Sequence, residues 1–191
     1  ESNCRAQVYQ AEIPSIESNT SVNLKRDTIK TGAKTFVISG IQNRCVSVNN
    51  IENITIGKPP KSKLTGEILD HNWLPGVMRD SSVVMKIVSD VFSEEQMEKL
   101  SHSNHKLRIL CHVDMDTKHV FEMAFELYYD EFDKSLLNIT PQDLSILEDE
   151  LKSKLIFDYK EFWEYAPEYI KQSSYFYNNI MISFKDGLHV N

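Results

Sequence analysis

Glycine and cysteine are both scarce in this chain, and their scarcity removes whole classes of function. The 191 residues include six glycines and three cysteines. No glycines stand at the spacing of a phosphate-binding loop, which excludes nucleotide binding through the P-loop or dinucleotide motifs. The Gly-x-Ser-x-Gly motif of serine hydrolases is also absent. The cysteines at positions 4, 45 and 111 are too far apart to match a zinc or redox motif.

Positive charge and long apolar runs are lacking as well. The chain has 21 Lys and Arg against 28 Asp and Glu, a net charge of -7. A nucleic-acid partner is not expected, because phosphate binding needs a concentrated basic face. No stretch approaches the roughly 18 apolar residues of a membrane helix, so no transmembrane segment is expected. Since Glu1 replaces an initiator Met, we expect that a leader has been removed, either in the cell or where the chain was cut.

The three cysteines allow at most one disulfide bond and leave one thiol over. Cys4 and Cys45 both lie in the N-terminal segment and could pair with each other. Cys111 lies in the apolar run 107–113, which predicts a buried and unreactive thiol.

Turn-forming residues divide the chain near residue 80. Nine of the twelve glycines and prolines fall before that point, which predicts a turn-rich first part and a more regular second part. Residues 1–80 are therefore predicted to be an irregular, β-rich segment packed on the core, with short strands at 8–13, 35–39 and 45–56. Residues 57–79 are predicted to be an irregular connection anchored by Trp73. Residues 81–191 are predicted to form an α+β domain.

The first elements of the second part are predicted from alternation and capping. Residues 83–92 alternate loosely and predict a strand. Ser93 and Gln96 form a capping box that opens a helix over 94–100. Residues 106–114 and 119–129 alternate with a period of two around a turn at 116–118, which predicts a β-hairpin. One face of its first strand carries Leu107, Ile109, Cys111 and Val113.

The strongest helix signal covers residues 140–154. Thr140 is a good N-cap, Pro141 suits the first helical position, and Asp143 favours the positive end of the helix dipole. One apolar stripe is expected from Leu144, Leu147, Leu151 and Leu155. The opposite, solvated face is expected to carry Glu148, Asp149, Glu150, Lys152 and Lys154.

Short strands at 155–157 and 179–184 complete the predicted order of strand, helix, hairpin, helix, strand, strand. The predicted fold class is α+β: an antiparallel sheet with two helices on one face, plus the turn-rich β N-terminal segment.

The second part resembles the C-terminal domain of the TonB energy transducers. The similar features are the hairpin text from Leu107 to Val120, the Leu-rich helix at 140–154 and the closing phrase Ile180-Met-Ile-Ser-Phe184. The phrase from Leu144 to Phe157 resembles even more closely a set of uncharacterised exported proteins from gut-dwelling Gram-negative bacteria. The resemblance covers roughly residues 82–186.

The resemblance implies a TonB C-terminal-like fold and a periplasmic or exported location. It does not carry over the energy-coupling function. Thr117 stands where the family usually has glycine, and the Tyr-Pro motif before the family's first helix is missing.

The residue clusters that could bind a metal or catalyse a reaction can also be explained as ordinary solvent-exposed side chains. His112 and His119 are predicted to lie near each other at the hairpin turn, where a surface metal site is conceivable, but exposed sheet residues explain them as well. Acidic clusters occur at 130–133 and 148–150. On the predicted helix, the consecutive carboxylates of 148–150 spread over a solvated face and do not converge on one atom. The sequence therefore predicts no catalytic residues, no cofactor and no metal.

Aromatic residues concentrate between positions 158 and 177. This segment is either packed back over the sheet or presented as a binding surface, since rings with polar tips are favoured at interfaces. The proposed surface residues are Tyr159, Phe162, Trp163, Tyr165 and Tyr169, and the same run continues through Tyr175, Phe176 and Tyr177.

The sequence therefore predicts a non-catalytic exported module that binds a protein or an envelope component. The alternative is a hydrolase of an envelope polymer whose carboxylates converge only in the fold. Self-association through an exposed edge strand of the hairpin would make the protein a homo-oligomer.

Overall fold

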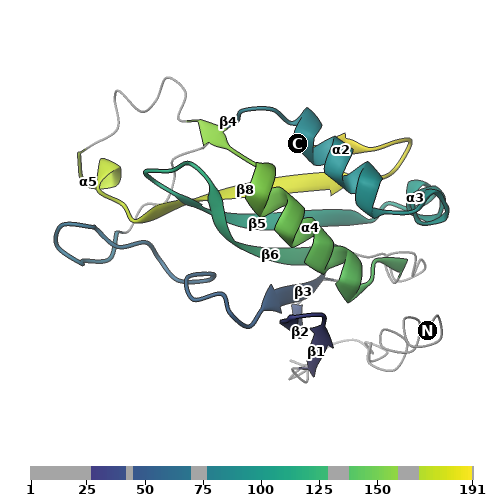
Figure 1. Cartoon of the computed structure of the whole chain (residues 1–191), viewed down its shortest axis with the longest axis horizontal. Helices are drawn as coiled ribbons and strands as arrows, with labels where there is room; N and C mark the ends of the chain where they lie inside the picture. Colours follow the sequence, from purple (N-terminus) through teal and green to yellow (C-terminus); the bar gives the residue numbers. More distant parts are fainter. Residues whose placement is uncertain (1–26, 42–44, 70–76, 129–137, 159–167, 191) are drawn as a thin grey trace.

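The protein is built around one antiparallel sheet of seven strands (Figure 1). The structure is a computed structural model, and it describes residues 27–41, 45–69, 77–128, 138–158 and 168–190. The strand order is β1-β2-β3-β6-β5-β8-β9. Their bounds are β1 Asp27–Thr31, β2 Lys34–Ile41, β3 Cys45–Asn50, β5 Lys106–Asp114, β6 Val120–Tyr128, β8 Tyr175–Ser183 and β9 His189–Val190. The short strands β4 (Val77–Met78) and β7 (Phe157–Asp158) pair with each other separately.

Helices cover one face of this sheet. The described helices are α2 (Ser82–Val91), α3 (Glu94–Ser101), α4 (Pro141–Lys154) and α5 (Glu168–Lys171). Figure 1 shows α2 and α4 side by side across the same face of the sheet, and their buried side chains join those of the strands in one hydrophobic core. The predicted fold class, α+β with two helices on one face of an antiparallel sheet, is confirmed. Among the described residues, no helix has the length and apolar character of a membrane span.

The central hairpin of β5 and β6 forms as its period of two predicts. Leu107 and Ile109 pair with Leu127 and Phe125, and all four are buried on the helix-covered face. The register shifts between His112 and Val113, which leaves a β-bulge near the turn.

Both strands of the hairpin lie inside the sheet. β6 pairs with β3 on one side, and β5 pairs with β8 on the other. The hypothesis that an exposed edge of the hairpin drives self-association is therefore wrong, because neither strand has a free row of backbone donors and acceptors.

The predicted strand at 83–92 is also wrong, because this segment is helix α2. Its buried residues Val84, Ile87 and Val88 recur at helical spacing and face the core. Loose alternation suggested a strand, but packing against α4 and the sheet outweighs that weak local signal. The second part therefore begins with two helices and not with a strand and a helix.

Helix α4 begins and ends as predicted. Thr140 accepts a hydrogen bond from the Asp143 backbone N–H at 3.2 Å, and the Asp143 carboxylate accepts one from the Thr140 backbone N–H at 2.8 Å. This capping box satisfies two backbone donors that the first turn leaves without partners. The predicted apolar stripe, Leu144, Leu147, Leu151 and Leu155, is buried throughout. The capping box of α3 at Ser93 and Gln96 is confirmed as well.

One residue of the predicted solvated face of α4 is placed differently. Glu148 is fully buried, although the spacing along the helix assigned it to the exposed side. The cause is that β2 and β3 extend under α4, where Lys34 and Asn50 provide partners for the Glu148 carboxylate.

The strands of the N-terminal part continue the same sheet. β3 pairs with β6 from Cys45↔Tyr128 to Asn49↔Ala124, so the predicted strand at 45–56 is hydrogen-bonded to the second part. The predicted strand at 35–39 pairs with β3 and joins the sheet through it. β3 ends at Asn50. The predicted strand at 8–13 and Trp73 lie outside the described residues. A boundary between folding units near residue 80 stays a prediction.

The last long strand begins earlier than its sequence suggests. β8 starts at Tyr175, four positions before the predicted start at 179. Tyr175 and Phe176 are buried, so this end of the aromatic run belongs to the sheet.

Candidate functional site

Residues 51–69, here called the strap, connect to a cluster of ionisable and aromatic side chains on the face of the sheet opposite the helices. Figure 1 shows the strap leaving β3 and running past the end of the sheet where β8 begins. On β5 and β6 the helix-covered face carries Cys111 and Met123, so their neighbours His112 and Glu122 point to the opposite face. His112 and Glu122 are directly paired across the two strands.

Glu122 holds the first part of the strap by accepting four hydrogen bonds. Its carboxylate accepts from the backbone N–H of Ile54 at 2.6 Å, of Thr55 at 2.7 Å and of Ile56 at 3.0 Å. The Thr55 hydroxyl donates to it at 2.5 Å. Burial raises the pKa of Glu122, but these hydrogen bonds outweigh burial and hold its pKa below the usual value. Glu122 is therefore an ionised anchor whose oxygens are occupied.

His112 continues this chain of hydrogen bonds. The Thr55 hydroxyl oxygen lies 2.7 Å from His112 Nδ1. Since that hydroxyl gives its proton to Glu122, Nδ1 carries the proton that the hydroxyl oxygen accepts. His112 is 2% exposed, and its burial lowers its pKa to about 4, although the charge of Glu122 acts in the opposite direction. At neutral pH the ring is uncharged.

Aromatic rings enclose His112 from β8 and β6. The ring of Tyr175 stacks on it with centroids 4.6 Å apart, and the ring of Tyr177 meets it edge-on at 4.5 Å. The ring centroid of Phe121 lies 6.3 Å from that of His112, and Phe121 is 39% exposed. Both tyrosine hydroxyls donate to the backbone carbonyl of Lys58, which fixes the strap a second time. Burial raises the pKa of both tyrosines, so they stay neutral.

The far part of the strap is held by backbone hydrogen bonds next to α5. Lys63 N–H donates to Gln172 at 2.8 Å, and Ser174 N–H donates to Lys61 at 2.9 Å. Lys63 also forms an ion pair with Asp116 of the hairpin turn. The strap leaves apolar side chains in solvent: Ile51, Ile54, Leu64 and Ile68 are 59%, 70%, 75% and 59% exposed. Exposed apolar side chains in one segment are a feature of interaction surfaces.

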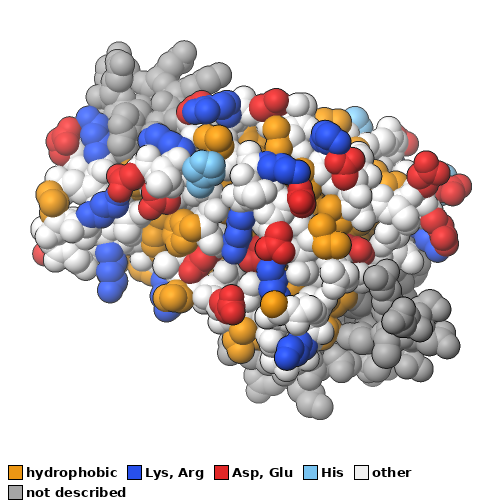
Figure 2. Space-filling model, viewed as in Figure 1, with side chains coloured by type: hydrophobic (Ala, Val, Ile, Leu, Met, Phe, Trp, Pro, Cys, Tyr) orange, Lys and Arg blue, Asp and Glu red, His pale blue; other side chains and the backbone are white. Residues whose placement is uncertain are grey.

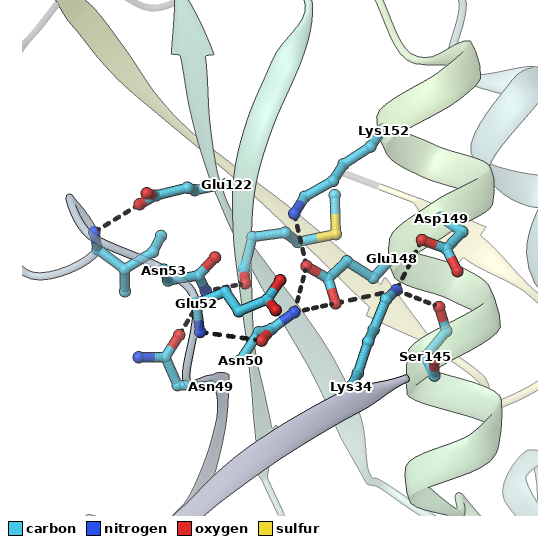
Figure 3. A network of polar contacts seen from close by, with 12 residues as sticks. Lys34, Asn49, Asn50, Glu52, Asn53, Glu122, Ser145, Glu148, Asp149 and Lys152 are labelled. Carbon is cyan, nitrogen blue, oxygen red and sulfur yellow. Dashed lines mark hydrogen bonds and ion pairs between the residues drawn. The ribbon is translucent and has the colours of Figure 1, made fainter. Parts of the chain in front are cut away.

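A second polar network lies under α4, on the helix-covered face (Figure 3). The Glu148 carboxylate accepts from Asn50 Nδ2 at 3.2 and 3.3 Å and lies 3.2 Å from Lys34 Nζ and 2.5 Å from Lys152 Nζ. Lys34 also donates to the Ser145 carbonyl at 2.9 Å. These contacts fasten α4 to β2 and β3. Glu148 and Glu122 thus lie on opposite sides of the sheet and do not face one substrate.

The structure describes only some of the residues that the sequence predicted at a site. Tyr159, Phe162, Trp163 and Tyr165 lie outside the described residues, as does the side chain of Tyr169, so their role as a binding surface stays a prediction. Cys4 and the acidic cluster at 130–133 also lie outside them. His112 is buried and not a solvent-facing sheet residue, which corrects that expectation. Among the described side chains, no group of three or more His, Cys, Asp and Glu is arranged to hold a metal ion.

The two buried thiols show no sign of activation. Cys111 is 1% exposed, and burial raises its pKa to about 12, as its apolar surroundings predicted. Burial and the nearby Glu126 raise the pKa of Cys45 to about 11. A thiolate nucleophile needs the opposite shift.

Sequence reasoning missed Glu122, Thr55 and Glu148. A weak signal existed for Glu122, because the hairpin register places it opposite His112 on the face away from Cys111. Nothing in the sequence shows that Thr55, 67 positions earlier, provides its partners.

Comparisons with known proteins identify a shared fold. No protein-family model matches the chain, and no curated protein matches it. Among solved structures, the chain is similar to a DUF5043 family protein from the gut bacterium Bacteroides uniformis, with a TM-score of 0.62 and 20% sequence identity. The similarity covers 82% of this chain and 84% of that chain. At this identity it concerns the fold alone. The similarity to a protein of a gut bacterium agrees with the sequence expectation, whereas the resemblance to TonB stays a prediction.

Proposed function

We propose that the chain is a non-catalytic, exported module that binds a protein or envelope component through its aromatic segment at 158–177. The observation that carries this proposal is the position of Tyr175 and Tyr177, which lie at the end of that segment that the structure describes. Tyr175 and Tyr177 join His112 and Phe121 in one ring cluster beside the strap, whose aliphatic side chains are exposed. Aromatic rings next to exposed apolar side chains suit a binding surface.

The surroundings of two buried glutamates, Glu122 and Glu148, favour binding over hydrolysis. Glu122 accepts four hydrogen bonds from the strap, and Glu148 is surrounded by Lys34, Lys152 and Asn50. A hydrolase needs two carboxylates that face a common substrate, one of them free to exchange a proton. These two lie on opposite sides of the sheet, which supports the binding module against the envelope-polymer hydrolase.

The remaining parts of the proposal rest on sequence. From α3 to β8 the order is helix, hairpin, helix and strand, with the short elements β7 and α5 between α4 and β8. This order supports a TonB C-terminal-like architecture. The exported location is proposed from that resemblance alone. On the helix-covered face, the described hydrophobic side chains lie in small groups between charged ones, so the binding surface is proposed at the aromatic segment instead (Figure 2).

The first test compares self-association in wild type and Trp163→Ala by size-exclusion chromatography with light scattering. If the aromatic segment is an interface between copies, the wild type forms a dimer that Trp163→Ala dissociates at unchanged melting temperature. Trp73→Ala is the matched control, since the chain has two tryptophans. Monomers in all three proteins with a much lower melting temperature for Trp163→Ala would mean that these rings are core.

The second test separates binding from hydrolysis with insoluble peptidoglycan as the envelope polymer. A binding module sediments with the polymer, loses this property in Trp163→Ala, and releases no soluble sugar. Release of reducing ends that stops in Glu122→Gln would instead establish the hydrolase.

A further inference from the structure

The part of the strap over the ring cluster is held by polar contacts rather than by apolar burial. None of the side chains from Ile54 to Lys58 is buried, and Ile54 is 70% exposed. These five residues are called the latch below. Their hydrogen bonds to the sheet go to Glu122, His112, Tyr175 and Tyr177. Apolar burial changes little with pH, but contacts to ionisable groups depend on their protonation state.

We propose that the latch is an acid-sensitive closure: protonation of His112 and Glu122 releases residues 54–58 from the sheet and exposes the ring cluster beneath them. The ring cluster is the described end of the aromatic segment, but the latch opens by its own chemistry whether or not that segment binds a partner. The acid-sensitive latch can therefore be contradicted without contradicting the proposed function, and the reverse also holds.

The direction of the effect follows from the environment of His112. In the closed form, burial lowers its pKa to about 4, whereas a solvated imidazole titrates near about 6.5. As pH falls from 6.5 to 4, the open form takes up a proton that the closed form does not, so the opening equilibrium constant rises. Over this whole window the rise amounts to roughly two orders of magnitude.

Glu122 acts in the same direction at lower pH. Its pKa in the closed form lies below the ordinary value of 4.5, because four donors stabilise its charge. The open form is therefore protonated first as pH falls below that value, which removes the acceptor for Ile54, Thr55 and Ile56. Both groups favour opening in acid, and neither opposes the other.

The other charged groups around the latch do not reverse this direction. From β8, Tyr175 and Tyr177 face His112, and their raised pKa values keep them neutral in acid. At the hairpin turn, Asp114 accepts from Asp116 and Thr117 backbone N–H groups. Lys63 pairs with Asp116 further along the strap. The Lys63–Asp116 pair holds the segment beyond the latch, and the Ile51 N–H, which donates to the Thr35 carbonyl, holds the segment before it. Both ends therefore stay attached when residues 54–58 open.

Hydrogen–deuterium exchange of the full chain at about pH 7 and about pH 5, corrected for intrinsic exchange rates, tests the device. We expect the protection of the Ile54, Thr55 and Ile56 amides to fall by roughly tenfold or more at the lower pH. Amides in the middle of α4 are expected to keep their protection. In His112→Phe, which keeps a stacked ring but cannot titrate, the difference between the two pH values disappears.

Glu126→Gln is the matched control, because Glu126 is a carboxylate on the same strand and face that pairs with Arg108 and not with the strap. It should retain the wild-type response. The proposal is overturned if the wild-type latch shows no pH dependence, or if the dependence survives in His112→Phe. Simultaneous loss of protection in α4 also overturns it, because acid would then unfold the whole protein. The wild-type experiment decides the matter even if His112→Phe does not fold.

Discussion

At the scale of single residues, buried ionisable groups distinguish this chain most clearly from a simple α+β scaffold. Glu148 is fully buried on α4, but its charge is balanced by Lys34 and Lys152 and by an amide of Asn50. Burying a carboxylate is costly unless such partners compensate for the lost water. The partners come from β2 and β3, so this one side chain joins the N-terminal strands to a helix more than 90 residues away.

Removal of the Glu148 carboxylate is expected to destabilise the protein strongly. Glu148→Ala leaves Lys34 and Lys152 beside a buried gap and should lower the free energy of unfolding by about 2–4 kcal/mol. Urea denaturation followed by circular dichroism measures the change. The control is Glu150→Ala, two positions along the same helix, whose exposed pair with Lys154 should contribute below about 0.5 kcal/mol. Equal effects of the two variants would contradict this assignment.

The buried thiols give a second prediction at this scale. Because burial raises the pKa of Cys45 to about 11 and of Cys111 to about 12, little thiolate forms near neutral pH. In the reduced, folded protein, both should react with iodoacetamide at about pH 8 roughly a hundredfold more slowly than after unfolding. Peptide mapping by mass spectrometry identifies each site. Fast labelling of either thiol in the folded protein would show that its burial is transient.

At the scale of elements, capping residues and an apolar stripe determine helix α4, whereas tertiary packing determines helix α2. Helix α4 has a complete capping box, a proline at its first turn and an apolar stripe. The N-cap of α2, Ser81, makes no side-chain capping bond, and α2 contains several branched residues. It is helical because Val84, Ile87 and Val88 reach the core only with helical spacing.

The cap of α4 is therefore expected to contribute measurably to stability. Thr140→Ala removes the hydroxyl that accepts from the Asp143 N–H and should lower the free energy of unfolding by about 1 kcal/mol. Thermal and urea denaturation measure the loss. Thr140→Ser, which retains the hydroxyl, should stay within about 0.3 kcal/mol of wild type. A serine variant as unstable as the alanine variant would show that the methyl group and not the cap matters.

At the scale of the whole molecule, the sheet joins strands from both ends of the sequence. β6 lies between β3 and β5, so its helix-covered side chains contact both the N-terminal strands and the central hairpin. Phe125 is fully buried in this central position and is paired with both Val48 and Ile109. A core shared in this way favours cooperative unfolding of both parts.

Truncation of Phe125 should consequently weaken both parts of the chain at once. Phe125→Ala is expected to cost about 3–5 kcal/mol of unfolding free energy, with one transition seen by both circular dichroism and fluorescence. Phe121→Ala, on the same strand and 39% exposed, should cost below about 1 kcal/mol. Two separate transitions would instead support a boundary between folding units near residue 80.

The sequence by itself determined the elements whose signals lie within a few consecutive residues. The hairpin follows from a period of two in 106–114 and 119–129, α3 from its capping box, and α4 from its N-cap, Pro141 and apolar stripe. Buried Cys111 follows from the apolar run around it. Each of these features depends on backbone geometry or hydrophobic pattern within one continuous segment, which a sequence displays directly.

Only the tertiary structure decided the helical state of α2, the burial of Glu148 and the attachment of the strap to Glu122. In each case the deciding partner is distant in the chain: Thr55 is 67 positions from Glu122, and Asn50 is 98 positions from Glu148. The local sequence pattern predicts that a charged side chain lies on the surface. Such a side chain is buried only where donors from distant segments compensate for its lost hydration. Those donors meet the carboxylates because β3 pairs with β6, a contact between strands more than 70 residues apart.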